Sequence, residues 1–224
     1  MTSLLLSVRN AEETLLALQT QVGIIDFKDP ALGALGALPA AQVQALLRLV
    51  AGRKLTSATI GDVPMTPDRI VPSALAMAGT GVDMVKVGIF KDGKPLACIQ
   101  ALSGLAQQGV SMVAVLMADQ QPDLNQIVAI AQAGFKGVML DTAVKNRSGL
   151  LQHLQMEEIQ HFVALGRQYD LMIGLAGELR HQQVLELLPL APDYIGVRGA
   201  ASRGQDRISS LDVERIEGLL ALLQ

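Results

Sequence analysis

The stretch Gly23-Ile24-Ile25-Asp26-Phe27-Lys28-Asp29-Pro30 decides how this chain can fold, because a short apolar run ends in a carboxylate and an amine. Side chains alternate between the two faces of a strand, so Asp26 and Lys28 point to the same side. A similar run over residues 83–86 ends in Lys86, and another over residues 137–141 ends in Asp141. The sequence therefore predicts several short buried strands with charged ends.

Outward from this stretch, short apolar runs alternate with longer segments of helical periodicity, a pattern typical of parallel βα units. The predicted strands cover Leu4–Val8, Gly23–Phe27, Leu55–Ile60, Asp83–Gly88, Ser111–Met117, Gly137–Asp141, Leu171–Leu175 and Tyr194–Val197. The predicted helices cover Ala11–Thr20, Ala40–Ala51, Pro67–Gly79, Pro95–Gln107, Leu124–Ala133, Met156–Tyr169, Leu179–Leu188 and Leu211–Leu223. Asn10 and Ser210 are the expected N-caps of the first and last helix.

Eight βα units within 224 residues predict an α/β fold, a closed (β/α)₈ TIM-type barrel that forms a single catalytic domain over residues 1–224. The rival is an open doubly wound sheet, which usually carries a Gly-x-Gly-x-x-Gly turn after its first strand. No such turn follows Val8. In a barrel the chemistry lies on the loops that follow the strands, and the segment 28–39 is the longest of these near the start of the chain.

Composition narrows the class of partner. The net charge is −3, aromatic residues make up 3% of the chain and there is no Trp, so we expect no nucleic-acid partner. No apolar run is long enough to cross a bilayer and the first residues make a poor signal peptide, so we expect no membrane partner. The single Cys98 fits a reducing compartment, which favours the cytoplasm. The oligomeric state stays open, and a homo-oligomer is compatible with the sequence.

Charged side chains gather where strands end. Three of the seven lysines, Lys28, Lys86 and Lys145, lie at such positions, together with Asp26 and Asp141. If the amines converge, each cation and partial burial disfavour protonation, so at least one amine should titrate well below an exposed lysine. A neutral amine is a nucleophile for carbonyls.

We predict that Lys28 forms a Schiff base and that Lys86 accepts a proton. Asp26 and Asp141 would hold protonated amines or shuttle protons, and Lys145 would pair with Asp141 or bind a phosphate. The alternative reading is that Asp26 and Lys28 form a simple ion pair at the mouth of the barrel.

A second group of residues predicts a phosphate site. The segment 196–204 follows the last strand, and Leu175-Ala176-Gly177 follows the seventh. Small residues let backbone N–H groups approach an anion, and barrels often bind phosphate at these two loops. The predicted phosphate-binding residues are Gly177, Arg198, Gly199 and Ala200, with Arg198 or Arg203 as the counter-charge. The substrate is then a small-molecule phosphate ester.

We expect no metal and no other cofactor. His153, His161 and His181 lie in a loop and on helices, away from strand ends, so a metal site or a His-based triad is not predicted. Cys98 reads as a helix residue packed inward. Asp62 and Asp119 also fall just after strands and join the list of polar residues at the predicted site edge.

The chain resembles the (5-formylfuran-3-yl)methyl phosphate synthases, also called 4-(hydroxymethyl)-2-furancarboxaldehyde-phosphate synthases. The resemblance runs nearly end to end, through residues 24–30, 33–36, 57–64, 85–88, 139–145 and 196–201. It departs from the family at Phe27, where a smaller aliphatic residue is expected, at Asp29, and over residues 202–207, which are less rich in glycine than in the family.

This resemblance implies a barrel lyase that condenses two molecules of glyceraldehyde 3-phosphate to a furan aldehyde phosphate, with loss of phosphate and water. It assigns the Schiff base to Lys28 and the proton acceptor to Lys86, and it implies a role in methanofuran or methylofuran biosynthesis. Two alternatives stay open from the residues alone. One is a phosphosugar isomerase or epimerase that works without an imine, and the other is a non-catalytic module that binds a phosphate ligand.

Overall fold

The structure is a computed structural model that describes residues 1–145 and 148–224. Its strands run in chain order and bear out the predicted positions to within two residues at either end. They are β1 (Ser3–Val8), β2 (Ile24–Phe27), β3 (Leu55–Thr59), β4 (Met84–Ile89), β5 (Met112–Met117), β6 (Gly137–Asp141), β7 (Met172–Leu175) and β8 (Tyr194–Val197). Every strand pairs in parallel with its neighbours in the sequence, and β1 also pairs with β8, so the sheet closes into a barrel. The predicted (β/α)₈ barrel is confirmed.

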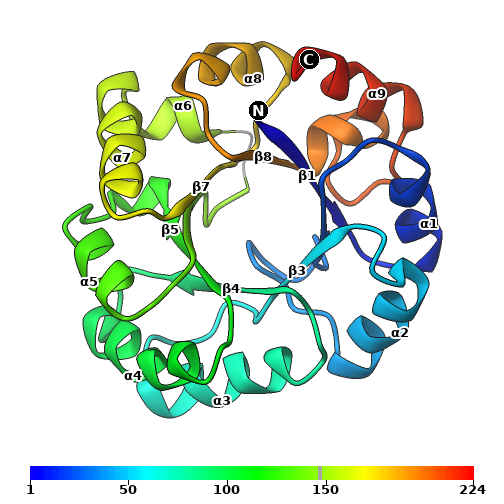
Figure 1. The fold of residues 1–224 in the computed structure, drawn as a ribbon. Helices are drawn as coiled ribbons and strands as arrows, with labels where there is room; N and C mark the ends of the chain where they lie inside the picture. Colours follow the sequence, from blue (N-terminus) through cyan, green and yellow to red (C-terminus); the bar gives the residue numbers. More distant parts are fainter. Residues whose placement is uncertain (146–147) are drawn as a thin grey trace.

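The helices lie outside the ring of strands (Figure 1). The α-helices are α1 (Ala11–Gln19), α2 (Ala40–Val50), α3 (Pro67–Ala78), α4 (Pro95–Gln107), α5 (Gln126–Gln132), α6 (Leu150–His153), α7 (Met156–Gln168), α8 (His181–Leu187) and α9 (Val213–Leu222). Short 3₁₀ turns are η1 (Ala118–Gln120), η2 (Leu188–Leu190), η3 (Gly199–Ala201) and η4 (Arg203–Gln205). No helix in the described ranges is long and apolar enough to cross a membrane.

Helix starts follow local chemistry. Asn10 caps α1 by accepting a hydrogen bond from the backbone N–H of Glu13, as predicted. The prediction that Ser210 caps the last helix is wrong, because Asp212 is the N-cap and accepts from the N–H of Arg215. A carboxylate at this position also faces the positive end of the helix dipole, which favours Asp212 over the neutral hydroxyl.

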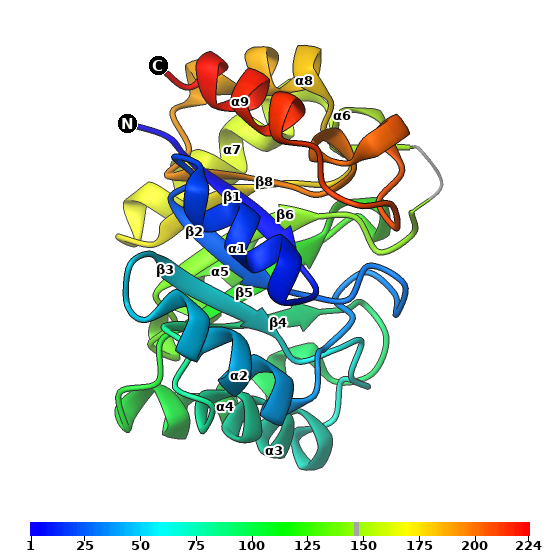
Figure 2. The same ribbon diagram turned by 90° about the vertical axis from the view of Figure 1, so that its right-hand side faces the viewer.

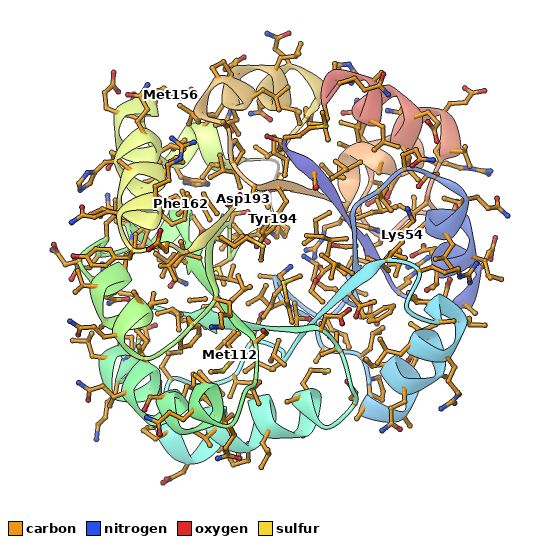
Figure 3. All side chains as sticks on the ribbon, in the orientation of Figure 1. Lys54, Met112, Met156, Phe162, Asp193 and Tyr194 are labelled. Atoms are coloured by element: carbon orange, nitrogen blue, oxygen red, sulfur yellow. The ribbon has the colours of Figure 1, made fainter. Side chains whose placement is uncertain are left out.

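Two apolar layers hold the barrel together. The larger layer lies between the strands and the helices, where Phe162 of α7 packs with residues such as Val138 and Ile173. The smaller layer fills the inside of the ring and includes Leu5 and Tyr194. Figure 3 places Tyr194 within the ring of strands and Phe162 outside it. The lower barrel is therefore a packed core, and the site must lie above it.

The strand arrows all point toward one end of the barrel, where the loops after β2 and β8 gather (Figure 2). Both chain termini lie near the opposite end in Figure 2. Lys28 directly follows β2 and Asp141 ends β6, so both lie at this mouth, whereas Lys86 lies within β4, three residues before the end of the strand.

Candidate active site

Asp26 forms the floor of the site. Its carboxylate is fully buried and accepts hydrogen bonds from Ser7 Oγ at 2.9 Å and Ser57 Oγ at 2.7 Å. Lys86 Nζ lies 3.0 Å from Asp26 Oδ1 in an ion pair whose two side chains are 1% and 0% exposed. Burial raises the pKa of Asp26 and is the largest single effect, but the positive charges of Lys86 and Lys28 together with the hydrogen bonds to the carboxylate outweigh it, so the net shift of the pKa is downward. The carboxylate therefore stays ionised.

Lys86 is held near Asp26 without being fully satisfied. Within residues 1–145 and 148–224, its Nζ has no hydrogen-bond partner of good geometry, although the ion pair is close. The same side chain lines the cavity above the barrel core. A buried ammonium with unused N–H groups is costly unless something else accepts from it, so Lys86 is available to a ligand in the cavity.

Asp141 joins the other two lysines. Its Oδ2 lies 3.9 Å from Lys28 Nζ, and its Oδ1 lies 2.6 Å from Lys145 Nζ. Oδ1 also accepts from the backbone N–H of Thr142 at 2.8 Å. Burial raises the pKa of Asp141, but the charges of Lys145 and Lys28 and the hydrogen bonds from Lys145 and Thr142 together lower it more, so the net shift of the pKa is strongly downward. Asp141 is thus a fixed negative charge between two amines.

The surroundings of Lys28 lower the pKa of its amine. Burial lowers the pKa of Lys28 from 10.5 to about 8; Asp141 and Asp26 oppose that change, whereas Lys86 and Lys145 add to it. Loss of water contributes more to the lowered pKa of Lys28 than the neighbouring cations do. The result is an amine with a substantial neutral fraction near neutral pH, which is the property that imine chemistry needs.

A cavity of about 360 Å³ lies over these residues. Lys28, Lys86, Asp141 and Lys145 line it from the barrel, and the loops after β7 and β8 line it from above. Asp26 lies below the lining and acts through Lys86. The volume is in the range of pockets that enclose small molecules.

The loops after β7 and β8 bring small residues to the cavity. Gly177, Gly199 and Ala200 all line it. Gly177 has a φ of +101°, and a Cβ there would lie 3.1 Å from Thr142 Cγ2, so both the backbone and the space favour glycine. Whether these backbone groups bind phosphate stays a prediction.

Arg198 lines the cavity, but its guanidinium is held by partners within the protein. Its guanidinium donates to Glu13 Oε1 and Oε2 at 2.9 and 2.6 Å, and its remaining N–H groups reach the backbone oxygens of Ser7, Arg207 and Ser209. All five donors of the guanidinium are engaged, and the ion pair with Glu13 is 5% exposed on each side. The side chain of Arg198 therefore has no donor left for a phosphate.

Sequence reasoning missed Glu13 and Arg207. Glu13 lies on α1, and its separation of 185 positions from Arg198 hides the pair from any local pattern. Arg207 lies in a segment that the sequence marked only for its departure from the family, yet its side chain lines the cavity. One available signal was the presence of a further arginine in the loop after β8.

Asp62 and Asp119 each hold a neighbouring loop through hydrogen bonds to its backbone. Asp62 accepts from the backbone N–H groups of Ala34 and Leu35, and Asp119 accepts from those of Ala143 and Val144. Each carboxylate thus ties the loop after a neighbouring strand. Neither lines the cavity over Lys28 within the described ranges.

Comparison with known proteins gives the family. A family model described as 4-HFC-P synthase matches residues 4–220. The chain belongs to the 4-HFC-P synthase family. The resemblance seen in the sequence is therefore confirmed, and the protein is an enzyme of that family.

Two relatives show how far the similarity of this 4-HFC-P synthase family member extends. It is 38% identical over 214 residues to a protein of Methylorubrum extorquens that bears the name (5-formylfuran-3-yl)methyl phosphate synthase provisionally, covering 95% of this chain and 88% of that protein. It is 33% identical over 215 residues to the (5-formylfuran-3-yl)methyl phosphate synthase of Methanopyrus kandleri, covering 91% of each.

Among solved structures, a 3-hexulose-6-phosphate synthase covers all of both chains with a TM-score of 0.71. The sequences are 17% identical, so this likeness concerns the barrel fold of the 4-HFC-P synthase family member alone.

Proposed function

We propose that this protein condenses two molecules of glyceraldehyde 3-phosphate to (5-formylfuran-3-yl)methyl phosphate through an imine on Lys28. The observation that carries the proposal is the buried amine of Lys28, whose pKa is lowered to about 8 and which lies 3.9 Å from Asp141 at the floor of the cavity. Membership of the 4-HFC-P synthase family and the names of the relatives support the product. The protein would then be a carbon–oxygen lyase that acts on phosphates.

The atoms balance without an oxidant or a reductant. Two triose phosphates supply the six carbons of the product, and one phosphate and two waters leave. Neutral Lys28 Nζ adds to the aldehyde carbon of the first triose, and water leaves to form the iminium. The second triose loses phosphate by β-elimination to an enal, and loss of a proton from the carbon next to the iminium gives an enamine whose carbon adds to the terminal carbon of that enal. The aldehyde of the second triose becomes the formyl group, its hydroxyl closes the ring on the imine carbon, and loss of a second water and of the Lys28 amine completes the furan.

The neighbouring charges have separate roles in this proposal. Lys86 gives a proton to the water that leaves as the iminium forms and, then neutral, accepts the proton from the substrate carbon, while Asp26, 3.0 Å from its Nζ, stabilises the ammonium form. Asp141 stabilises the positive charge that develops on Lys28 when the iminium forms. Lys145, 2.6 Å from Asp141, relays a proton or binds a leaving oxygen.

The substrate phosphate is proposed to bind where the loops after β7 and β8 meet the cavity, at the backbone of Gly177, Gly199 and Ala200. We further propose that the reaction supplies the furan for methanofuran-type one-carbon carriers in the cytoplasm, with no resident metal or organic cofactor. The described residues hold no group of three or more His, Cys, Asp or Glu side chains that could ligate a metal ion.

The test combines covalent trapping with product analysis. The native protein is incubated with glyceraldehyde 3-phosphate and borohydride, and the modified residue is located by mass spectrometry of peptides. We expect reduced triose phosphate on Lys28 and, without borohydride, a furan aldehyde phosphate with release of inorganic phosphate. Lys28→Arg should lose both results, because a guanidinium is not a nucleophile at this pH.

Lys136→Arg is the matched control, since Lys136 is exposed and precedes β6 at the closed end of the barrel. It should label and turn over like the native protein. Isomerised triose phosphate as the sole product, with no label on Lys28, would favour an isomerase and reject the imine. Full turnover by Lys28→Arg would reject the assigned nucleophile.

A further inference from the structure

The loop after β8 contains three arginines with different surroundings. The guanidinium donors of Arg198 are all engaged by Glu13 and three backbone oxygens. Arg203 is exposed and is not among the residues that line the cavity in the described part of the chain. Arg207 is partly buried and does line it, beside Gly199 and Ala200. The loop therefore directs one of its three guanidinium groups to the substrate cavity.

Arg207 is anchored at both ends. Its backbone oxygen accepts a hydrogen bond from Arg198 Nε at 2.8 Å, so the buried pair of Arg198 and Glu13 fixes the backbone. Its Nη2 donates to the backbone oxygen of Gly33 at 3.0 Å, which connects the loop after β8 to the loop after β2. The second of these loops begins at Lys28. The guanidinium thus connects two loops around the cavity that Lys28 also lines.

Most of the donors of Arg207 remain for a ligand. Within residues 1–145 and 148–224, the hydrogen bond to Gly33 engages one of its five N–H groups. Burial lowers the pKa of Arg207, whereas the charges of Asp141 and Glu178 favour its protonated form. A partly desolvated guanidinium that faces a cavity binds a phosphate more strongly than one in open water, and its fork geometry suits two phosphate oxygens.

We infer that Arg207 is the cation that binds the phosphate of the triose phosphate substrate, held in position by the buried pair of Glu13 and Arg198. The inference rests on the proposed function for the identity of the substrate. The phosphate lies between the guanidinium and the backbone of the loops after β7 and β8, and the aldehyde end reaches Lys28. Arg207 therefore provides the counter-charge that the sequence assigned to Arg198 or Arg203, and it distinguishes phosphorylated aldehydes from neutral ones.

The test measures borohydride trapping at Lys28 as a function of aldehyde concentration. Glyceraldehyde 3-phosphate and unphosphorylated glyceraldehyde are compared in the native protein, Arg207→Ala, Arg207→Lys and the control Arg203→Ala. Arg207→Ala should raise the half-saturating concentration of glyceraldehyde 3-phosphate by about tenfold to a hundredfold, the usual value of a charge-assisted contact, and leave that of glyceraldehyde unchanged. Arg207→Lys should keep part of the preference and Arg203→Ala all of it.

An unchanged half-saturating concentration of glyceraldehyde 3-phosphate in Arg207→Ala would overturn the inference. An equal rise for both aldehydes would also overturn it, because it would mean a general distortion of the site. If no aldehyde is trapped in the native protein, the imine proposal fails by itself, and calorimetry with inorganic phosphate then tests Arg207 directly. Weaker phosphate binding by Arg207→Ala and Arg207→Lys would support the site, and equal binding would reject it.

Discussion

At Lys28, burial and four neighbouring charges act on a single nitrogen. Loss of water favours the neutral amine most strongly, Lys86 and Lys145 act in the same direction, and Asp141 and Asp26 act against it. The pKa of about 8 is the balance of these opposing effects. The reactivity of Lys28 should therefore move in opposite directions when a carboxylate or a neighbouring lysine is removed.

The pH profile of imine trapping tests this balance. A pKa of about 8 predicts that trapping at Lys28 accelerates as the pH rises through 8 and levels off above it, because the neutral amine is the nucleophile. Asp141→Asn removes a charge that favours the ammonium, so the midpoint should fall by about one pH unit. Lys86→Met removes a cation, so the midpoint should rise by about the same amount.

The control is Lys136→Arg, which should keep the native midpoint. The profiles are measured by the initial rate of label incorporation at Lys28. Shifts in the same direction for Asp141→Asn and Lys86→Met would contradict the electrostatic account of Lys28, as would a flat profile between pH 6.5 and 9.

Residues at strand ends could be predicted because strand alternation and parallel pairing are local rules. Asp26, Lys28 and Lys86 were found in this way. The pair of Glu13 and Arg198 could not be found, because helix α1 meets the loop after β8 only when the barrel closes. Local rules therefore predict the charges near the mouth, whereas the pairing of Arg198 with Glu13 depends on closure of the barrel.

At the scale of elements, periodicity located the strands and the long helices, since their apolar residues recur at fixed intervals over many residues. The helix α6 was expected to be loop, because four residues are too short for a periodic signal. The start of α5 was placed at Leu124, but the helix begins at Gln126, since Asp123 first forms a turn with Asn125.

The loop after β2 is held by a carboxylate from the loop after β3. Asp62, after β3, accepts from the N–H of Ala34 at 3.1 Å and of Leu35 at 2.9 Å in the loop after β2. Gly33 of the same loop has a φ of +89° and lies so close to Asp62 that a side chain there would collide with the carboxylate. Gly33 is also the residue that Arg207 contacts. Asp62 therefore shapes the loop that Arg207 contacts.

Asp62→Ala should loosen the loop without unfolding the barrel. Loss of two hydrogen bonds to a charged acceptor should accelerate amide exchange at Ala34 and Leu35 by about tenfold or more. Hydrogen exchange followed by mass spectrometry or NMR measures this effect. Asp68→Ala, which removes an exposed acid from α3, should leave the same amides at the native rate. Native protection of both amides in Asp62→Ala would mean that the hydrogen bonds to Asp62 do not hold the loop.

At the scale of the whole molecule, closure of the ring depends on filling its interior. Tyr194 of β8 is paired in register with Gly174 of β7, and its ring occupies the space where a side chain of residue 174 would stand. Tyr194 belongs to the apolar cluster inside the barrel, together with Leu5 and Met139. The ring of Tyr194 thus fills the space of two side chains at this level of the interior. A large residue beside a glycine fits the narrow interior of a barrel formed by 224 residues.

Gly174→Ala tests whether this packing stabilises the barrel. The added methyl group would overlap the ring of Tyr194, so we expect the free energy of unfolding to fall by about 1–3 kcal/mol, as for other overpacked cores. Gly104→Ala is the control, since Gly104 is exposed in α4 and no atom lies within 4 Å of the added carbon. It should raise the free energy of unfolding by about 0.5–1 kcal/mol, because alanine is the better helix former.

Combining Gly174→Ala with Tyr194→Leu separates steric overlap from a backbone effect. Leucine lacks the atoms that the new methyl group would meet, so the double variant should be less destabilised than the sum of the two single variants, by about 1 kcal/mol or more. Denaturant unfolding of the four proteins gives the coupling. Strict additivity would place the cost of alanine in the strand backbone, and the interior of the barrel would then tolerate a side chain opposite Tyr194.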